Sequence, residues 1–175
     1  VGRIYVDLLH EISDSLKAEY ALFGSFIDGE TSDVARIEPR IGLAWSPTDG
    51  QWLRAGFMRS SIDLTTPTLS PIGIVGIQPN AISVETEGYV DTYALRWDAE
   101  WTPDFFTALQ YQHQEMDNPR IPISLVSTPF TTSVGRLYRA SLTTNAVPGA
   151  GFSLSSPLAY TASDDQRSVT PTSGG

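Results

Sequence analysis

Residues 35–60 alternate apolar with charged or small side chains, and this pattern constrains the fold more than any other feature of the chain. Ile37, Ile41 and Leu43 fall on one side of the first half, and charged or small residues lie between them. The turn SPTDG follows, and the alternation resumes with Leu53 and Phe57. A period of two marks β-strands whose two faces meet different environments. We therefore predict a β-hairpin with one apolar and one polar face.

The same period recurs along the chain and predicts about eight antiparallel strands. Residues 14–22 also suit a helix, because Lys, Ala, Glu and Leu are good helix formers. The alternation nevertheless continues through Gly24 and Phe26, which favours a strand. The predicted strands are residues 2–12, 15–27, 35–46, 52–60, 89–101, 105–115, 134–144 and 151–160.

The connections between these strands alternate between short and long. SDS, SPTDG, TPD and NAVPGAG are short, whereas DGETSDV and the stretches around residues 61–87 and 116–132 are long. Strands of about ten residues, short periplasmic turns and long extracellular loops are typical of transmembrane β-barrels. We therefore expect an all-β fold, an antiparallel transmembrane β-barrel segment, with the loop after Ser60 as an outward-facing element. A soluble β-sandwich is the competing fold.

Composition narrows the function classes. Charged residues make up 18% of the chain, below the roughly 25% usual for soluble domains. No apolar run approaches the roughly 20 residues of a membrane helix, which excludes helical spans but not residence in a membrane. The absence of Cys excludes disulfides and thiolate sites. The acidic pI of 4.5 disfavours nucleic-acid binding.

No motif in the sequence indicates an enzyme. There is no nucleophile elbow and no phosphate-binding glycine loop. The segment DGETSD carries carboxylates but lacks the calcium-loop pattern. We expect no catalytic residue, no metal and no cofactor.

Charged side chains on the polar strand faces are candidates for the lining of a barrel lumen. Opposite signs on neighbouring strands can pair there across the ladder. Such a network is structural, with ion selectivity or solute passage as a further role. The candidates are Arg36, Glu38, Arg40, Arg54, Arg96, Asp98 and Glu100. Asp91 and Arg59 fall on the apolar side instead, near the long-loop ends of their strands, where a charge costs little.

Aromatic residues gather at the short-turn ends of the predicted strands. Barrels carry aromatic girdles at the membrane interfaces, so we predict a girdle there. Ordinary core aromatics are the alternative. The predicted girdle consists of Trp45, Trp52, Trp101 and Phe105.

Acidic residues concentrate in the predicted long loops. An acidic rim could attract cations or bridge to anionic lipid through divalent cations, although simple solvation explains the same composition. The extracellular acidic candidates are Asp28, Glu30, Asp33, Glu85 and Glu87.

Two stretches resemble known outer-membrane proteins. IEPRIGLAWSPTDGQWLRAGFMRS, followed by PTLSPIG, is similar to the barrel region of TonB-dependent outer-membrane receptors. The matching residues are Pro39, Arg40, Ile41, Gly42, Leu53, Arg54, Ala55, Pro67, Thr68 and Leu69. YALRWDAEWTPDFFTALQYQHQE also resembles hairpins of outer-membrane barrels that follow tetratricopeptide repeats. The resemblance implies solute uptake and an inner-membrane energy-coupling partner, but no plug domain, energy-coupling box or closing aromatic strand is recognisable.

We expect residues 1–160 to form part of a larger barrel and residues 161–175 to form a polar, disordered tail. The expected location is the outer membrane of a Gram-negative-type bacterium, in contact with its lipid. The expected function is transport, most simply as part of a receptor-like barrel for solute uptake. An export porin or repeat-linked barrel is one alternative, and a soluble β-sandwich or adhesin-like binding module is another.

Overall fold

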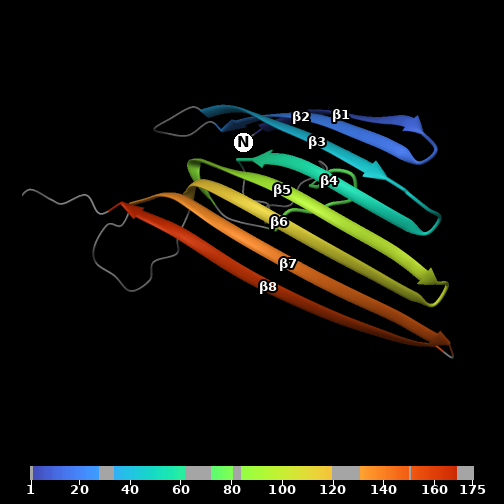
Figure 1. Ribbon diagram of the computed structural model, residues 1–175. Coiled ribbons are helices and arrows are strands. Elements are labelled where there is room, and N and C mark those ends of the chain that lie inside the picture. Colours follow the sequence, from blue (N-terminus) through green and yellow to red (C-terminus); the bar gives the residue numbers. More distant parts are fainter. Residues whose placement is uncertain are drawn as a thin grey trace, which may run out of the picture.

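The computed structural model describes residues 2–27, 34–61, 72–80, 84–119, 131–149 and 151–168. Eight antiparallel strands form one sheet in sequence order, which confirms the predicted all-β fold and the strand number (Figure 1). The strands are β1 (Gly2–Ser13), β2 (Leu16–Ile27), β3 (Val34–Trp45), β4 (Gln51–Ser60), β5 (Val84–Thr102), β6 (Phe105–Pro119), β7 (Thr131–Gly149) and β8 (Phe152–Ser168). Residues 14–22, for which helix was the competing prediction, are extended.

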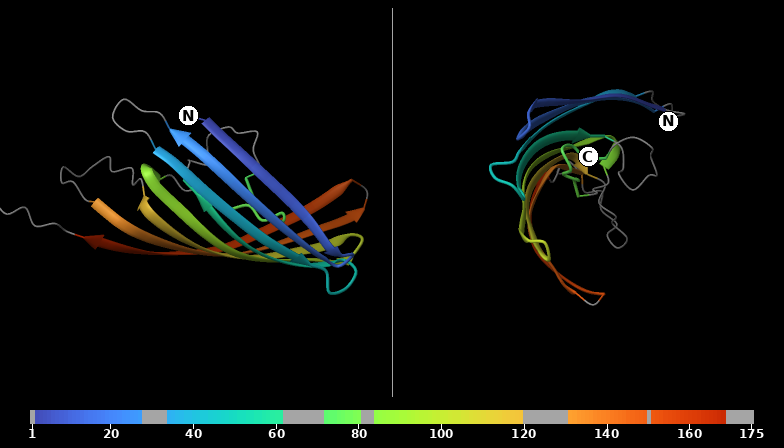
Figure 2. Two further views of the ribbon diagram at one scale, coloured as in Figure 1. Left: turned by 90° about the horizontal axis from the view of Figure 1, so that it is seen from above. Right: turned by 90° about the vertical axis from the view of Figure 1, so that its right-hand side faces the viewer.

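The sheet is curved and open. Every strand pairs with its neighbour in sequence, so β1 and β8 are its two edges. Seen from the end, the strands follow an arc that has a convex and a concave face (Figure 2). Since β1 and β8 are not paired, a closed barrel is not part of the observed fold.

Several strands are longer than predicted. β5 begins at Val84 rather than Tyr89, so Glu85 and Glu87 belong to a strand and not to a loop. β8 continues to Ser168, past the predicted end at Tyr160, which corrects the predicted disordered tail over residues 161–168. A polar segment can extend a sheet when its neighbour offers free main-chain groups, and β7 pairs with β8 through Arg136↔Asp164 and beyond. Asp28, Glu30, Asp33 and residues 169–175 lie outside the described residues.

One junction between neighbouring strands is much shorter than the others. β3 and β4 pair only from Arg40↔Met58 to Trp45↔Leu53, whereas β2 pairs with β3 along its whole length. Pro39 is the first residue of β3 that does not pair with β4, although it pairs with Leu22 of β2. Proline has no N–H to donate to a ladder. We call the unpaired part, residues 34–39 of β3 facing the end of β4, the β3–β4 seam.

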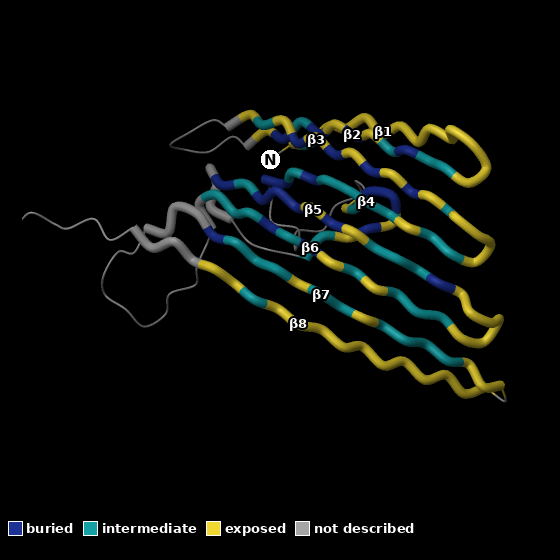
Figure 3. Tube along the Cα trace, in the orientation of Figure 1, coloured by how far each residue is buried: buried dark blue, intermediate teal, exposed yellow. Residues whose placement is uncertain are grey.

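The buried core lies on the concave face. Residues 72–80, which we call the inward loop, cross this face over the middle strands (Figure 2). Buried residues gather there, while β1 and β8 are exposed along most of their length (Figure 3). The apolar members of this core are Ala21, Phe23, Ala44, Met58, Ile74, Val75, Ile77 and Ala94. The prediction that the segment after Ser60 faces outward is wrong for residues 72–80.

Candidate functional site

Two facing glycines make room for the inward loop on the concave face. Gly42 of β3 and Gly56 of β4 are directly opposite each other in the ladder. A Cβ on Gly42 would lie 2.7 Å from Val75 and 2.8 Å from Ile74, and a Cβ on Gly56 would lie 2.7 Å from Ile74. These distances are too short for side chains, so the loop can approach the sheet only where both residues are glycine.

The tip of the inward loop is a miniature hairpin. Ile74 and Ile77 exchange main-chain hydrogen bonds of 3.0 and 2.8 Å across a two-residue turn. Both turn residues have positive φ, 43° at Val75 and 78° at Gly76, as a type I′ turn requires. Positive φ is unfavourable for a β-branched residue. The N–H of Val75 donates to Glu19 Oε2 at 2.7 Å, which helps to hold this conformation.

Side chains of β6 bind the other end of the inward loop. The Nε2 of Gln112 donates to the carbonyl of Gln78 at 2.6 Å, and its Oε1 accepts from the N–H of Asn80 at 3.1 Å. The Nε2 of Gln114 donates to the carbonyl of Asn80 at 3.1 Å. Each glutamine is 1% exposed, so the pairs are shielded from water. An amide suits this task because it both donates and accepts, as a peptide group does.

The role of these glutamines was not predicted from the sequence. Gln110, Gln112 and Gln114 alternate on the polar face of β6, where the neighbouring strands carry charges. Neutral amides at Gln112 and Gln114, on a face where charges would be expected, were the signal in the sequence for a main-chain partner. Arg139 of β7 adds a hydrogen bond of 2.9 Å from Nη1 to Asn80 Oδ1.

Glu38 is the centre of a polar cluster on the concave face. This side chain is fully buried and pairs with Arg3 of β1. Its Oε1 accepts from Ser25 Oγ at 2.7 Å and from Ser61 Oγ at 2.6 Å. A buried carboxylate needs such partners to offset its lost hydration. Glu38 therefore ties β1, β2 and β3 to the residue that follows β4.

Two further predicted lumen residues fix the inward loop and the β3–β4 seam. Arg40 is 2% exposed, lies 4.0 Å from the ring centre of Phe23, and donates to the carbonyl of Ile72 at 2.8 Å. Arg36 donates to the carbonyl of Gly88 at 2.5 Å and so reaches from β3 to β5.

The remaining predicted lumen residues lie nearer the short turns. Arg54 and Arg96 are opposite each other on β4 and β5, and Asp98 pairs with both. The shared carboxylate offsets the repulsion that two facing guanidinium groups produce. Glu100 is exposed, and its N–H donates to the carbonyl of Gly50 at 2.7 Å, so it belongs to the turn rather than to this cluster.

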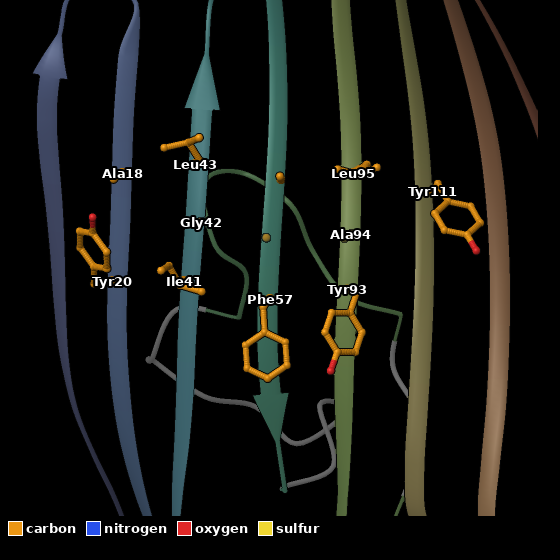
Figure 4. A pocket seen from close by; sticks show the side chains of 12 residues that line it. Ala18, Tyr20, Ile41, Gly42, Leu43, Phe57, Tyr93, Ala94, Leu95 and Tyr111 are labelled. Atoms are coloured by element: carbon orange, nitrogen blue, oxygen red, sulfur yellow. The ribbon is translucent and has the colours of Figure 1, made fainter.

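The convex face is apolar and exposed. Tyr20, Ile41, Phe57 and Tyr93 project from it around the small residues of neighbouring strands, and a hollow of about 540 Å³ lies among them (Figure 4). The large convex-face residues include Ile37, Leu43, Leu53, Leu95, Leu109 and Leu158, each more than 40% exposed.

A row of charged residues crosses the convex face at its long-loop side. The ladder places Arg59, Asp91, Glu115, Arg136 and Asp164 side by side on β4 to β8. Arg59 binds Asp91 through two hydrogen bonds of 2.7 and 2.6 Å. Arg136 pairs with Glu115 at 3.4 Å. Arg59 and Asp91, which fitted an apolar face poorly, thus neutralise each other.

Three of the four predicted girdle residues lie on the convex face. Trp45, Trp101 and Phe105 are exposed at the short-turn ends, and Trp101 donates to Thr107 Oγ1 at 2.8 Å. Trp52 does not join them. It packs against the concave core, 5.7 Å from the guanidinium carbon of Arg54. The alternation of β4 places Trp52 on the same face as Arg54, which is the concave face. Its position near a turn does not determine on which face of the sheet the side chain lies.

No protein-family model, curated protein or solved structure matches this chain. Within the described ranges, no helix is long and apolar enough to cross a membrane. No group of three or more His, Cys, Asp or Glu residues that could hold a metal ion occurs in the same part of the chain.

Proposed function

We propose that this chain forms part of the wall of an outer-membrane β-barrel that transports a hydrophilic solute. The convex face would contact lipid, and the concave face would line the lumen. In this arrangement the inward loop narrows the passage. The proposal includes closure of the sheet, which the open arc does not contain.

The observation that carries the proposal is the apolar, unpacked convex face. Ile37, Leu95 and Leu158 of this face are 68%, 59% and 69% exposed. Soluble monomers rarely expose contiguous apolar patches beyond a few hundred Å². Lipid is the environment in which such a face is stable.

The partly exposed charges of the concave face support the passage of a solute through the lumen, in addition to a structural role. Arg54, Arg96 and Asp98 remain partly exposed below the inward loop. A hydrophilic solute would meet both charge signs there, next to the apolar tip formed by Ile74, Val75 and Ile77. A narrowing with mixed charge selects solutes by size and polarity.

Uptake by a receptor-like barrel is the more specific form of the proposal. It is supported by the resemblance to TonB-dependent receptors, whose matching residues include Arg40 and Gly42 at the contact with the inward loop. An energy-coupling partner in the inner membrane would then be required. An export porin would have the same wall with the opposite direction of transport.

Detergent dependence tests the lipid-facing assignment. The purified chain should be monodisperse in dodecyl maltoside, aggregate when detergent is removed, and float with lipid vesicles in a density gradient. A chain that stays monodisperse in plain buffer would contradict the proposal and favour a soluble binding module.

Conductance in planar bilayers tests passage. Replacing residues 73–79 with a short Gly-Ser linker should raise the conductance, because the inward loop would no longer narrow the lumen. Replacing the exposed turn residues 47–49 is the control and should leave it unchanged. Equal conductance in all three proteins would contradict the role of the inward loop.

A further inference from the structure

The β3–β4 seam borders two hollows of different chemistry. One, of about 280 Å³, is lined by Arg36, Ile37, Glu38, Arg59, Ser61 and Tyr89. The other, of about 510 Å³, is apolar and lies over β1 to β3, with Ile4, Val6, Leu22, Phe26 and Ile37 among its lining residues. Arg36 and Ile37 line both hollows, so the two adjoin.

The apolar surface of the convex face extends farther toward the long loops on β1 to β3 than on β4 to β8, and the change occurs at this seam. On β4 to β8 the apolar surface ends at the charged row that begins with Arg59. On β1 to β3 it continues beyond that row, through Ile37 of β3 and Ile4 of β1, which pair with the two sides of Gly24. Ile37 and Ile4 are 68% and 65% exposed. A charged edge and an apolar surface therefore meet side by side at the seam.

The polar hollow favours an anion. Glu38 is already paired with Arg3, and Asp91 is already paired with Arg59. Arg36 donates to the carbonyl of Gly88. This carbonyl is neutral, so the bond does not compensate the positive charge of Arg36. Among the described residues around this hollow, the balance is thus one positive charge. Arg59 lies 4.4 Å above the Tyr89 ring and binds Asp91 through Nε and Nη2.

We propose that the β3–β4 seam binds a single-chain anionic amphiphile, with its headgroup beside Arg36 and Arg59 and its alkyl chain in the apolar hollow over β1 to β3. The polar hollow provides donors for the headgroup, and guanidinium groups suit phosphate and carboxylate groups. The apolar hollow, of about 510 Å³, provides space for one alkyl chain. The site rests on the proposed function only in that it places the convex face in lipid.

The seam also explains why the site can form here. Main-chain hydrogen bonds join neighbouring strands elsewhere, but beyond Arg40 the β3–β4 contact depends on side chains. Ser61 donates to Glu38, and Arg36 reaches Gly88. A side-chain contact can rearrange around a headgroup without breaking a ladder, so an amphiphile can be accommodated at this junction.

Fluorescence quenching tests the site directly. A Phe26→Trp reporter lies in the apolar hollow, and the probe is lysophosphatidylglycerol with a dibrominated acyl chain, titrated into the protein in dodecyl maltoside. The zwitterionic lysophosphatidylcholine with the same chain is the matched ligand. We expect the anionic probe to quench the reporter saturably and with at least tenfold higher affinity than the zwitterionic one.

Arginine variants identify the headgroup site. Arg36→Gln and Arg59→Gln should each weaken binding of the anionic probe at least fivefold. Arg136→Gln, which removes an arginine from the same charged row but away from the seam, should change it less than twofold. Equal affinity for both probes, or equal loss in all three variants, would overturn the proposal.

Mass spectrometry of the freshly purified protein separates the two sources of the ligand. One co-isolated anionic lipid per chain that the probe displaces indicates a resident membrane lipid. A site that is free on isolation but binds the probe indicates an amphiphile supplied from solution. Because binding is measured in detergent, it can fail while conductance is present, or persist while conductance is absent.

Discussion

The convex and concave faces are built from the same strands, yet their charged residues lie in different places and have different surroundings. On the concave face Glu38 and Arg40 are buried beneath or beside the inward loop, each held by several partners. On the convex face the charges gather at the long-loop side, and apolar side chains occupy most of the rest. The difference teaches that, among the described residues, the hydrophobic core cluster lies on the concave face. On the proposed function, lipid covers the convex face.

The largest effect should come from removing the charge at the centre of the concave network. Glu38→Ala leaves Arg3 without its carboxylate and two serine hydroxyls without an acceptor. We expect a loss of about 3–5 kcal/mol in the free energy of unfolding. Urea unfolding in detergent, followed by tryptophan fluorescence, measures it. Glu100→Ala, an exposed carboxylate of the same strand system, should change stability by less than about 0.5 kcal/mol.

A charge placed on the convex face should cost almost as much, but only in lipid. Leu95→Arg introduces a guanidinium in the middle of the apolar face, at a residue that is 59% exposed. We expect a loss of about 2–4 kcal/mol in bilayers. Thr143→Arg, on the concave side of β7, is the matched control and should cost much less. Unchanged stability of Leu95→Arg in bilayers would remove the assignment of this face to lipid.

A single methyl group tests the fit of the inward loop. Gly42→Ala forces Val75 and Ile74 away from β3, which should cost about 1–3 kcal/mol as overpacking does. Amide hydrogen exchange in residues 72–80 should also accelerate. Gly24→Ala is the control, since its Cβ would meet the Ile4 side chain at 3.3 Å and the Phe26 ring at an ordinary contact distance of 3.7 Å. Unaltered exchange in residues 72–80 would show that the loop does not depend on this contact.

The smallest effect should come from the exposed Arg136–Glu115 pair in the charge row of the convex face. Arg136→Gln removes a partner of Glu115 when both side chains are more than 40% exposed. Exposed ion pairs contribute about 0–1 kcal/mol. A loss well above this range in urea unfolding would mean that the row is buried by an environment of low polarity.

Strand number, strand pairing and the two faces could be predicted from the sequence, because a period of two depends only on neighbouring residues. Ile37, Leu43 and Leu95 therefore fell on the correct side. The strand ends at Val84 and Ser168 were not predicted, since Glu and Thr in residues 85–87 and Ser, Asp and Gln in residues 163–168 leave no apolar alternation to follow. Their extension depends on pairing with a neighbour, which is a property of the sheet.

The inward loop could not be predicted, because its site exists only after two strands pair. Gly42 and Gly56 are far apart from Ile74 in sequence, and their vacancy appears only when the register places them opposite each other. Trp52 was misplaced for a different reason. Its position at a turn suggested the girdle, but the alternation of β4 had already put it beside Arg54.

The central claim is that the two faces meet lipid and water, and adjacent cysteines test it most directly. Because the chain has no Cys, Leu142→Cys on the convex side of β7 and Thr143→Cys on its concave side each provide one labelling site. In lipid vesicles, a fluorophore at residue 142 should be quenched by nitroxide lipids and protected from aqueous iodide, and a fluorophore at residue 143 should behave in the opposite way. Iodide quenching of equal strength at both residues would contradict the account.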